Sequence, residues 1–217
     1  MNNIVILGAG GFARELMWLI ESIGTWNIVG FVRNEEENEI RTLCGYQNYP
    51  NLESLFATWK NGNTDLHYCF GTGSPRIKRM MDAQAREKGL TPSSPLIHPD
   101  VRMHRSVKLG NNVVVCAGTI LTIDITIGYG TMLNLNCTVG HDAVIGEYCT
   151  FNPGTHISGE VTIQDEVECG TNVSVIQGLT VGKGAVIGAG AAVVRSIPEG
   201  VTAVGVPAKP LKKDGNN

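Results

Sequence analysis

Residues 127–163 read IGYGTMLNLNCTVGHDAVIGEYCTFNPGTHISGEVTI, and an apolar residue stands at every sixth position of this stretch. The same frame of six runs without an insertion from Val101 to Ile197. A helix would need apolar residues at a spacing near 3.6, and simple alternating strands would not hold a strict six over so long a segment. The pattern therefore predicts a β-solenoid of short strands and corners, in which three sixes make one triangular turn and each turn stacks about 4.8 Å from the last.

Two positions of each six are expected to face the interior of this solenoid. The first is apolar and is occupied by Met103, Leu109, Val115, Leu121, Ile127, Leu133, Val139, Ile145, Phe151, Ile157, Ile163, Cys169, Val175, Val181, Ile187 and Val193. The second lies four residues on and is small or β-branched, as at Val113, Thr131, Ala143, Val161 and Ala185. Gly often follows the first position, where we expect a tight bend. Cys137, Cys149 and Cys169 occupy inward positions, so we expect buried free thiols rather than disulfides.

The segment before the solenoid alternates strands and helices. Strands are predicted at residues 3–8, 28–32 and 66–70, and helices at residues 14–23, 52–59 and 76–88. This order predicts a small α/β domain with a parallel, Rossmann-like sheet. We expect two domains, residues 1–92 and 93–217, with Pro92, Pro95 and Pro99 marking the join.

Charge and hydropathy exclude several classes of function. The 217-residue chain has a net charge of −3, and between Leu109 and Gly182 it has seven acidic residues and no Lys or Arg. Nucleic acid is not expected along such a surface. No stretch approaches the roughly 20 apolar residues of a membrane span, and Met1 leads straight into a strand, so a cytoplasmic location is expected. Basic residues gather on either side of the acidic segment, where a phosphate-bearing ligand would be anchored.

A glycine-rich turn, Gly8-Ala9-Gly10-Gly11-Phe12-Ala13, joins the first predicted strand to the first predicted helix. Small residues at such a turn allow backbone N–H groups to approach a phosphate closely. A nicotinamide site would need an acidic residue after the second strand, where this chain has Arg33-Asn34. We therefore favour a mononucleotide or sugar-nucleotide pyrophosphate over NAD. A purely structural tight turn remains an equal alternative.

One histidine of the solenoid has polar neighbours. His141 lies two positions after the inward Val139 and is expected to point outward, with Asp142 beside it and Asn134 seven residues earlier. Acyl transfer from a thioester needs a base, an oxyanion donor and placement of both substrates. One turn of eighteen residues beyond His141 is Gly159, whose N–H could serve as that donor, while Asp142 could orient the imidazole. His156 lacks an acidic neighbour and is expected to be structural or supporting.

The histidines do not predict a metal site. His98, His104, His141 and His156 are separated by 6, 37 and 15 residues. These spacings do not match the histidine pair and third ligand of zinc-containing solenoids of the carbonic anhydrase type.

Nearly the whole chain resembles the sugar O- and N-acetyltransferases that include the bacillosamine, perosamine and sialic acid acetyltransferases. The resemblance rests on the glycine-rich turn, the strict hexapeptides, the Gly140-His141-Asp142 signature and the closing Val204–Pro210 segment. It implies a left-handed parallel β-helix, a homotrimer with active sites between solenoids, and acetyl-CoA lying along the coil. It also implies a nucleotide-linked amino sugar held partly by the N-terminal domain.

The resemblance assigns roles to individual residues. His141 takes the place of the catalytic base, Asp142 that of its acidic partner and Gly159 that of the oxyanion donor. Substrate contacts are implied at Gly10, Gly11, Phe12, Arg33, Asn34, Gly71 and Asn134, and acetyl-CoA contacts near Thr150, Thr171 and Ala189. Bacillosamine-type members differ at Phe12, Arg33-Asn34, Gly140 and Thr150, which implies a different nucleotide base or sugar.

The sequence therefore predicts an acetyl-CoA-dependent N-acetyltransferase that acts on a nucleotide-linked 4-amino-deoxy sugar in O-antigen or other surface glycan synthesis. Two alternatives stay open at this point. The first is O-acetylation of a sugar of the sialic acid type, which would use the same base. The second is a solenoid that binds nucleotide sugars without catalysis.

Overall fold

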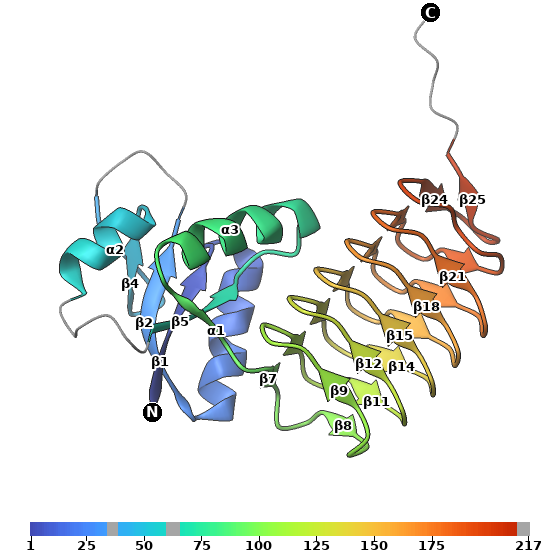
Figure 1. The fold of residues 1–217 in the computed structure, drawn as a ribbon, viewed down its shortest axis with the longest axis horizontal. Coiled ribbons are helices and arrows are strands. Elements are labelled where there is room, and N and C mark those ends of the chain that lie inside the picture. The colour runs from blue at the N-terminus through green and yellow to red at the C-terminus, as the bar shows by residue number, and fades with distance from the viewer. Residues whose placement is uncertain (34–38, 60–65, 212–217) are drawn as a thin grey trace, which may run out of the picture. The chain divides into compact units, whose positions relative to one another are not determined.

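The computed structural model describes residues 1–33, 39–59 and 66–211 of the chain (Figure 1). The chain divides into two compact units, Met1–Pro99 and Asp100–Asn217. The sequence placed the boundary between residues 92 and 93, and that position stays a prediction.

The described part of the first unit is an α/β domain. Its sheet contains β1 (Asn2–Leu7), β2 (Trp26–Val32), β3 (Arg41–Leu43), β4 (Tyr46–Tyr49), β5 (Leu66–Phe70) and β6 (Thr91–Pro92), in the order β3-β4-β2-β1-β5-β6. The helices are α1 (Gly11–Ile23), α2 (Leu52–Thr58) and α3 (Pro75–Glu87), and a short strand, β7 (Leu96–Ile97), follows β6. Pairs along the sheet are parallel except for β3 with β4. The predicted α/β class is confirmed.

The antiparallel edge of this sheet was not predicted. Strands β3 and β4 form a hairpin in which Leu43 pairs with Tyr46. The two turn residues, Cys44 and Gly45, have φ angles of 51° and 83°. Positive φ at both positions is typical of the type I′ turns that match the twist of a two-residue hairpin. The flanking residues are largely polar, so hydrophobic periodicity gave no signal for these strands.

The second unit is a β-solenoid with an eighteen-residue turn. Residues eighteen apart pair in parallel, as Val114 does with Met132 and Thr138 with His156. One sheet contains β10 (Val114–Val115), β13 (Met132–Leu133), β16 (Thr150–Phe151), β19 (Glu168–Cys169), β22 (Val186–Ile187), β24 (Thr202–Val204) and β25 (Lys209–Pro210). The next contains β8 (Arg102–Met103), β11 (Ile120–Leu121), β14 (Thr138–Val139), β17 (His156–Ile157), β20 (Ser174–Val175) and β23 (Ala192–Val193). The third contains β9 (Lys108–Leu109), β12 (Thr126–Ile127), β15 (Val144–Ile145), β18 (Thr162–Ile163) and β21 (Thr180–Val181). The predicted hexapeptide β-helix is confirmed, and its left hand remains implied by the resemblance.

The inward positions form the core of the solenoid. From Val115 to Val193 the first position of every six is buried, and Thr131 at the second position satisfies its hydroxyl by donating to the Gly146 carbonyl at 2.9 Å. Met103 was expected inside but is 43% exposed. It lies in the first turn of the unit, which has a neighbouring turn of the same unit on one side only, so its side chain is not covered as those of later turns are.

The corners correct one expectation about the glycines. Left-handed backbone occurs in three columns with a spacing of eighteen: Asn112, Gly130, Tyr148, Glu166 and Gly184; Gly118, Asn136, Gly154, Asn172 and Gly190; Asp124, Asp142, Glu160 and Gly178. The glycines that follow the inward position are not among them. A Cβ on Gly128 would instead lie 2.6 Å from the Gly146 carbonyl carbon. These glycines permit close stacking of turns, and the bend is made two residues later.

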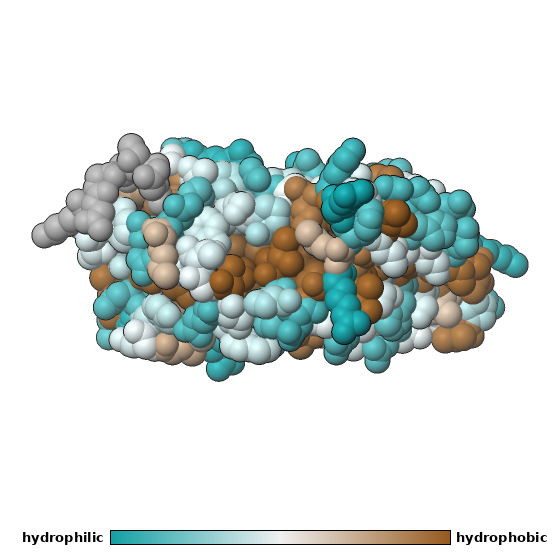
Figure 2. Space-filling model, turned by 90° about the horizontal axis from the view of Figure 1, so that it is seen from below, coloured by the Kyte–Doolittle hydropathy of each residue, from teal (hydrophilic) through white to brown (hydrophobic). Residues whose placement is uncertain are grey.

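The cysteines are free, as predicted, and only Cys44 is exposed. Burial raises the pKa of the Cys137 thiol to about 11 and also raises the pKa values of Cys69 and Cys169. None of the helices in the described residues is long and apolar enough to cross a membrane. The surface in Figure 2 mixes apolar and polar side chains, and exposed apolar residues of the solenoid include Ile120, Ile123, Val144, Ile176, Val186 and Val194.

Candidate active site and nucleotide pocket

His141 and Asp142 form a pair at a corner of the solenoid, directly after β14 and Gly140. The imidazole Nδ1 lies 2.9 Å from Asp142 Oδ2, and the two side chains are 48% and 60% exposed. Asp142 has a φ of 57°, so it occupies the left-handed position of its corner. Because an ionised carboxylate can only accept, Nδ1 carries the proton in this bond. Nε2 of a neutral imidazole is then left with its lone pair, as a general base requires.

Gly159 lies against this imidazole, one turn further along the coil. A Cβ built on Gly159 would be 2.5 Å from His141 Nε2 and 2.6 Å from Cε1. The next residue, Glu160, donates its backbone N–H to the His141 carbonyl at 2.8 Å, which ties the two corners together. Among the described residues no backbone hydrogen bond uses the Gly159 N–H. The corner therefore places a candidate base against Gly159, a buried residue whose N–H takes no part in the backbone hydrogen bonds of the described residues.

His156 is held away from this corner. It lies on β17 beside Thr138 of β14, and its Nδ1 is 2.9 Å from the Thr138 hydroxyl oxygen. Its ring is therefore engaged on the face of a sheet, three residues before Gly159. The expectation that His156 has a structural or supporting role stays a prediction, and this bond agrees with it.

The other residues assigned to the solenoid site differ in accessibility. Asn134 is buried, and its side-chain oxygen accepts the Leu135 N–H at 2.7 Å. Thr150 has no exposed surface, so a cofactor near this position could meet only neighbouring atoms. Thr171 and Ala189 are exposed. Within the described residues no cluster of His, Cys, Asp and Glu could hold a metal ion.

The glycine-rich turn of the first unit contains two kinds of glycine. Gly8 follows β1 with a φ of 118°, and an added Cβ would meet the Gly71 carbonyl oxygen at 2.9 Å. Gly71, at the end of β5, has no room because a Cβ would lie 2.7 Å from that of Ala13. Gly10 and Gly11 are exposed, and nothing lies within 4 Å of a Cβ placed on either. Packing within the unit therefore requires glycine at Gly8 and Gly71, but it does not require glycine at Gly10 or Gly11.

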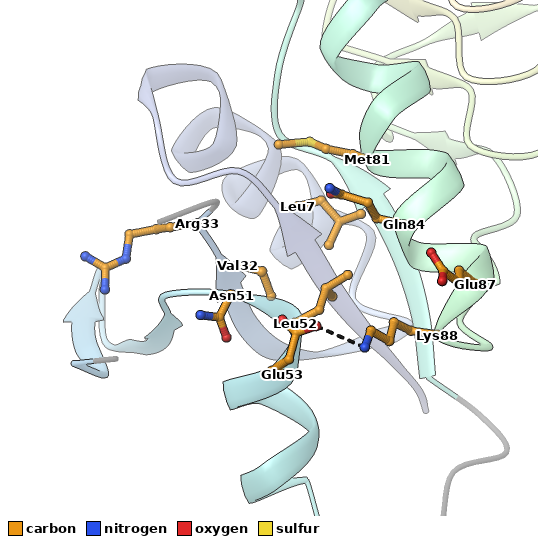
Figure 3. A pocket seen from close by; sticks show the side chains of 10 residues that line it. All are labelled: Leu7, Val32, Arg33, Asn51, Leu52, Glu53, Met81, Gln84, Glu87 and Lys88. Carbon is orange, nitrogen blue, oxygen red and sulfur yellow. Dashed lines mark ion pairs between the residues drawn. The ribbon is translucent and has the colours of Figure 1, made fainter. Parts of the chain in front are cut away.

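A cavity of about 290 Å³ opens at the carboxyl ends of β1 and β2 in the same unit (Figure 3). It is lined by Leu7, Val32, Arg33, Asn51, Leu52, Glu53, Met81, Gln84, Glu87 and Lys88. The Lys88 ammonium pairs with a Glu53 carboxylate oxygen at 2.9 Å, joining the end of α3 to the start of α2. This pair lowers the pKa of Glu53 and raises that of Lys88. Ligands of open α/β sheets bind outside the carboxyl ends of the strands, so the cavity is a candidate ligand site.

The predicted substrate residues of this unit meet the cavity only in part. Arg33 lines it and donates from a terminal guanidinium nitrogen to the Glu39 carbonyl at 2.7 Å. Gly10, Gly11, Phe12 and Gly71 are not among the lining residues, and Asn34 lies outside the described residues. The residues supplied by α2 and α3 were missed. Asn51 caps α2, and an Asn directly before a predicted helix was the available signal for it, whereas no local pattern points to Met81 or Gln84.

Comparison with known proteins agrees with both units. Residues 3–82 match the family described as the PglD N-terminal domain. WeeI from Acinetobacter baumannii AYE has a TM-score of 0.86 with 28% identity, covering 96% of this chain and 99% of that one. PerB from Caulobacter crescentus, solved with CoA and GDP-perosamine, has a TM-score of 0.85 with 29% identity and covers 98% of both chains. The acetyltransferase domain of PglB from Neisseria gonorrhoeae FA1090 has a TM-score of 0.71 with 27% identity, covering 97% and 100%.

Matches among curated sequences are shorter. A Schizosaccharomyces pombe protein provisionally assigned as an acetyltransferase is 48% identical over 65 residues, which are 30% of this chain and 31% of that protein. A tetrahydropyridine-dicarboxylate N-acetyltransferase of Staphylococcus aureus is 43% identical over 53 residues, 24% of this chain and 22% of that one. The chain thus spans about a third or less of the curated relatives that it matches. Together with the structural matches, these findings confirm the resemblance to the sugar acetyltransferases.

Proposed function

We propose that this chain, in which a PglD N-terminal domain precedes a solenoid of the sugar N-acetyltransferase type, transfers an acetyl group from acetyl-CoA to the amine of a nucleotide-linked 4-amino-deoxy sugar. The observation that carries the proposal is the His141–Asp142 pair lying against Gly159 on the solenoid. Support comes from PerB, which matches over the full length and was solved with CoA and GDP-perosamine. Variants of that enzyme with a histidine replaced by Asn or Ala were also solved with both ligands, which supports a central role for a histidine.

In the proposed mechanism the sugar amine attacks the thioester carbonyl directly. His141 Nε2 accepts the proton of the amine, and Asp142 holds the ring through Nδ1 and stabilises the imidazolium that forms. The Gly159 N–H donates to the oxygen on which negative charge develops. Collapse of the tetrahedral intermediate forms the amide and releases the CoA thiolate, which takes up a proton. No covalent enzyme intermediate is required.

The first unit would hold the nucleotide part of the substrate. Gly10 and Gly11 have open space above their backbone, so a pyrophosphate can approach the start of α1 closely. The cavity of the same unit, at the carboxyl ends of β1 and β2, is lined by the apolar side chains of Leu7, Val32 and Leu52 and by the amides of Asn51 and Gln84. This lining suits the flat apolar faces and polar edges of a nucleoside. Arg33, Asn34, Phe12 and Gly71 complete the proposed set of contacts, and Asn134 would face the sugar.

Acetyl-CoA would lie along the solenoid near Thr150, Thr171 and Ala189, and the active site would be completed in a homotrimer. The homotrimer is proposed from the resemblance to the sugar acetyltransferases, because exposed apolar residues such as Ile120 and Val144 lie on different sheets of the coil and do not form one extended patch. We further propose that the enzyme acts without a metal ion in the cytoplasm, in the synthesis of a surface glycan.

The test is an acetyl-transfer assay with purified protein, acetyl-CoA and a thiol reagent that detects released CoA. Acceptors are GDP-, UDP- and TDP-linked 4-amino-deoxy sugars and their matched 4-hydroxy analogues. We expect CoA release and a product heavier by one acetyl group with at least one amino acceptor. Transfer only to hydroxyl acceptors would favour O-acetylation. Nucleotide-sugar binding without CoA release from any acceptor would overturn catalysis.

A further inference from the structure

A polar cluster is buried between α3 and the sheet of the first unit. The Tyr68 hydroxyl on β5 donates to Asp82 Oδ1 on α3 at 2.5 Å, and Arg86 Nε donates to Asp82 Oδ2 at 2.8 Å. Tyr68 is fully buried, Asp82 is 6% exposed and Lys78, one helical turn before it, is 1% exposed. Neither the proposed chemistry nor the nucleotide contacts use these side chains. A role for the cluster therefore has to be sought in what α3 does.

Helix α3 presents one face to the buried interior of the unit and another to the cavity. Lys78, Asp82 and Ala85 are buried, and their spacing of four and three places them on one stripe of the helix. Met81, Gln84 and the C-cap residue Lys88 line the cavity and form a second stripe, with a spacing of three and four. Successive residues of a helix are separated by roughly 100° around its axis, so the two stripes differ by one residue step. Any rotation of α3 about its axis would therefore rotate the side chains of Met81 and Gln84 by the same angle relative to the sheet.

The Tyr68–Asp82 bond fixes that rotation more narrowly than apolar packing can. A hydrogen bond to a carboxylate has a preferred distance and direction, whereas contacts between apolar side chains tolerate small shifts. Apolar residues would often hold a helix on a sheet equally well or better, so a buried charged group is weak evidence for stability alone. Arg86 adds a second bond to the same carboxylate and fixes its orientation from the solvent side.

We propose that Tyr68 and Asp82 are positioning residues for the nucleotide site, holding α3 at the rotation that presents Met81 and Gln84 to the nucleoside. This inference rests on the proposed function, because it assumes that the cavity receives the nucleoside of the substrate. It extends that function by assigning affinity for the nucleotide to residues that do not touch it. The solenoid site, with His141, should be unaffected by changes in the cluster.

The experiment compares Tyr68→Phe with the unchanged protein and with Ile4→Val. Ile4 is fully buried on β1 and lies three residues before Leu7, so it faces the opposite side of the strand from the cavity, and its variant perturbs the core of the unit on that side. GDP, UDP and TDP are titrated by calorimetry, and steady-state constants are measured with an accepted amino sugar nucleotide. For Tyr68→Phe we expect the Kd of the preferred nucleotide, and the KM of its sugar, to rise roughly tenfold, while kcat and the KM of acetyl-CoA stay within twofold.

Asp82→Asn provides a second variant, because its amide oxygen can still accept from Tyr68. It should change nucleotide affinity less than Tyr68→Phe does. An unchanged Kd in Tyr68→Phe, or an equal rise in Ile4→Val, would overturn the inference. Loss of acetyl-CoA affinity in parallel would also overturn it, since that outcome indicates general damage. If no nucleotide binds the unchanged protein, the proposed function itself fails, and that result is distinct from equal binding by the protein and its variant.

Discussion

The two units build their candidate sites in opposite ways. In the solenoid the backbone repeats every eighteen residues, and the candidate site differs from neighbouring turns in its side chains. The equivalent corner residues of four successive turns are Ile123, His141, Gly159 and Gln177. In the α/β unit the site lies where β1, β2, α2 and α3 meet, so its residues are far apart in sequence. The first arrangement concentrates chemistry in one or two side chains. The second spreads binding over many, which predicts effects of very different size.

The largest effect is expected at the corner that holds His141. His141→Ala removes the proposed base while leaving the buried positions of its turn intact, so kcat should fall by about two to four orders of magnitude. The oligomeric state and the thermal unfolding temperature should not change. CoA release under saturating substrates measures the first quantity, and light scattering with calorimetry measures the others.

His156→Ala is the matched control for this comparison, because His156 is exposed on the same coil but bonds to Thr138. Its kcat should stay within a few fold of the unchanged protein. Near-normal turnover in His141→Ala, or an equal loss in both variants, would break the assignment of the base.

A smaller but more informative effect is expected at Gly159. Gly159→Ala keeps the backbone N–H, yet its methyl group would be placed 2.5 Å from His141 Nε2. The imidazole must move, and displacement of a catalytic group by about 1 Å can reduce the rate about a hundredfold. Gly128→Ala, which creates similar crowding between turns away from the corner, should leave kcat unchanged. If Gly159→Ala is fully active, Gly159 contributes only its N–H.

The sequence predicted the solenoid in detail because its physics is local. Within each group of six residues, the apolar and small positions identify the side chains that enter the narrow interior. The register, the eighteen-residue turn and the outward direction of His141 could therefore be predicted without knowledge of distant contacts. The exception was Met103, whose burial depends on which residues lie next to the first turn. The role of the stacking glycines was also misread, because their constraint comes from the neighbouring turn and not from their own φ.

The α/β unit was less predictable for the same reason. Alternating strands and helices predicted its class, but the cavity depends on α3 reaching the carboxyl ends of β1 and β2, which lie about seventy and about fifty residues before it in the sequence. Nothing in the local pattern around Met81 or Gln84 signals that contact. The buried Tyr68–Asp82 bond was equally hidden, because a Tyr on a strand and an Asp on a helix are ordinary in isolation.

The glycine-rich turn allows the two demands on one segment, packing and binding, to be separated. Gly71→Ala would crowd Ala13 and Ile6, and we expect a loss of about 1–3 kcal/mol in the free energy of unfolding. Gly11→Ala meets open space at the first position of α1, so stability should be unchanged or slightly higher, since Ala favours helix. Its methyl group would enter the proposed pyrophosphate site, raising the KM of the nucleotide sugar roughly tenfold. Denaturant melts and initial rates measure both effects. An unchanged KM of the nucleotide sugar in Gly11→Ala would contradict the proposal that the turn binds the pyrophosphate.

The last effect, which is absent at neutral pH, concerns the interior of the solenoid at alkaline pH. Burial raises the pKa of the Cys137 thiol to about 11, whereas an unfolded chain releases this proton near pH 9. Below pH 9 both states are protonated and stability is unaffected. Between pH 9 and 11 only the unfolded state loses the proton, so the free energy of unfolding should fall by about 1.4 kcal/mol per pH unit for this group.

Cys137→Ala should flatten that decline, although its cavity lowers stability at neutral pH. Cys44→Ala, which removes an exposed thiol, is the matched control. Equal slopes in the unchanged protein, Cys137→Ala and Cys44→Ala, measured by urea unfolding at a series of pH values, would contradict the raised pKa of Cys137.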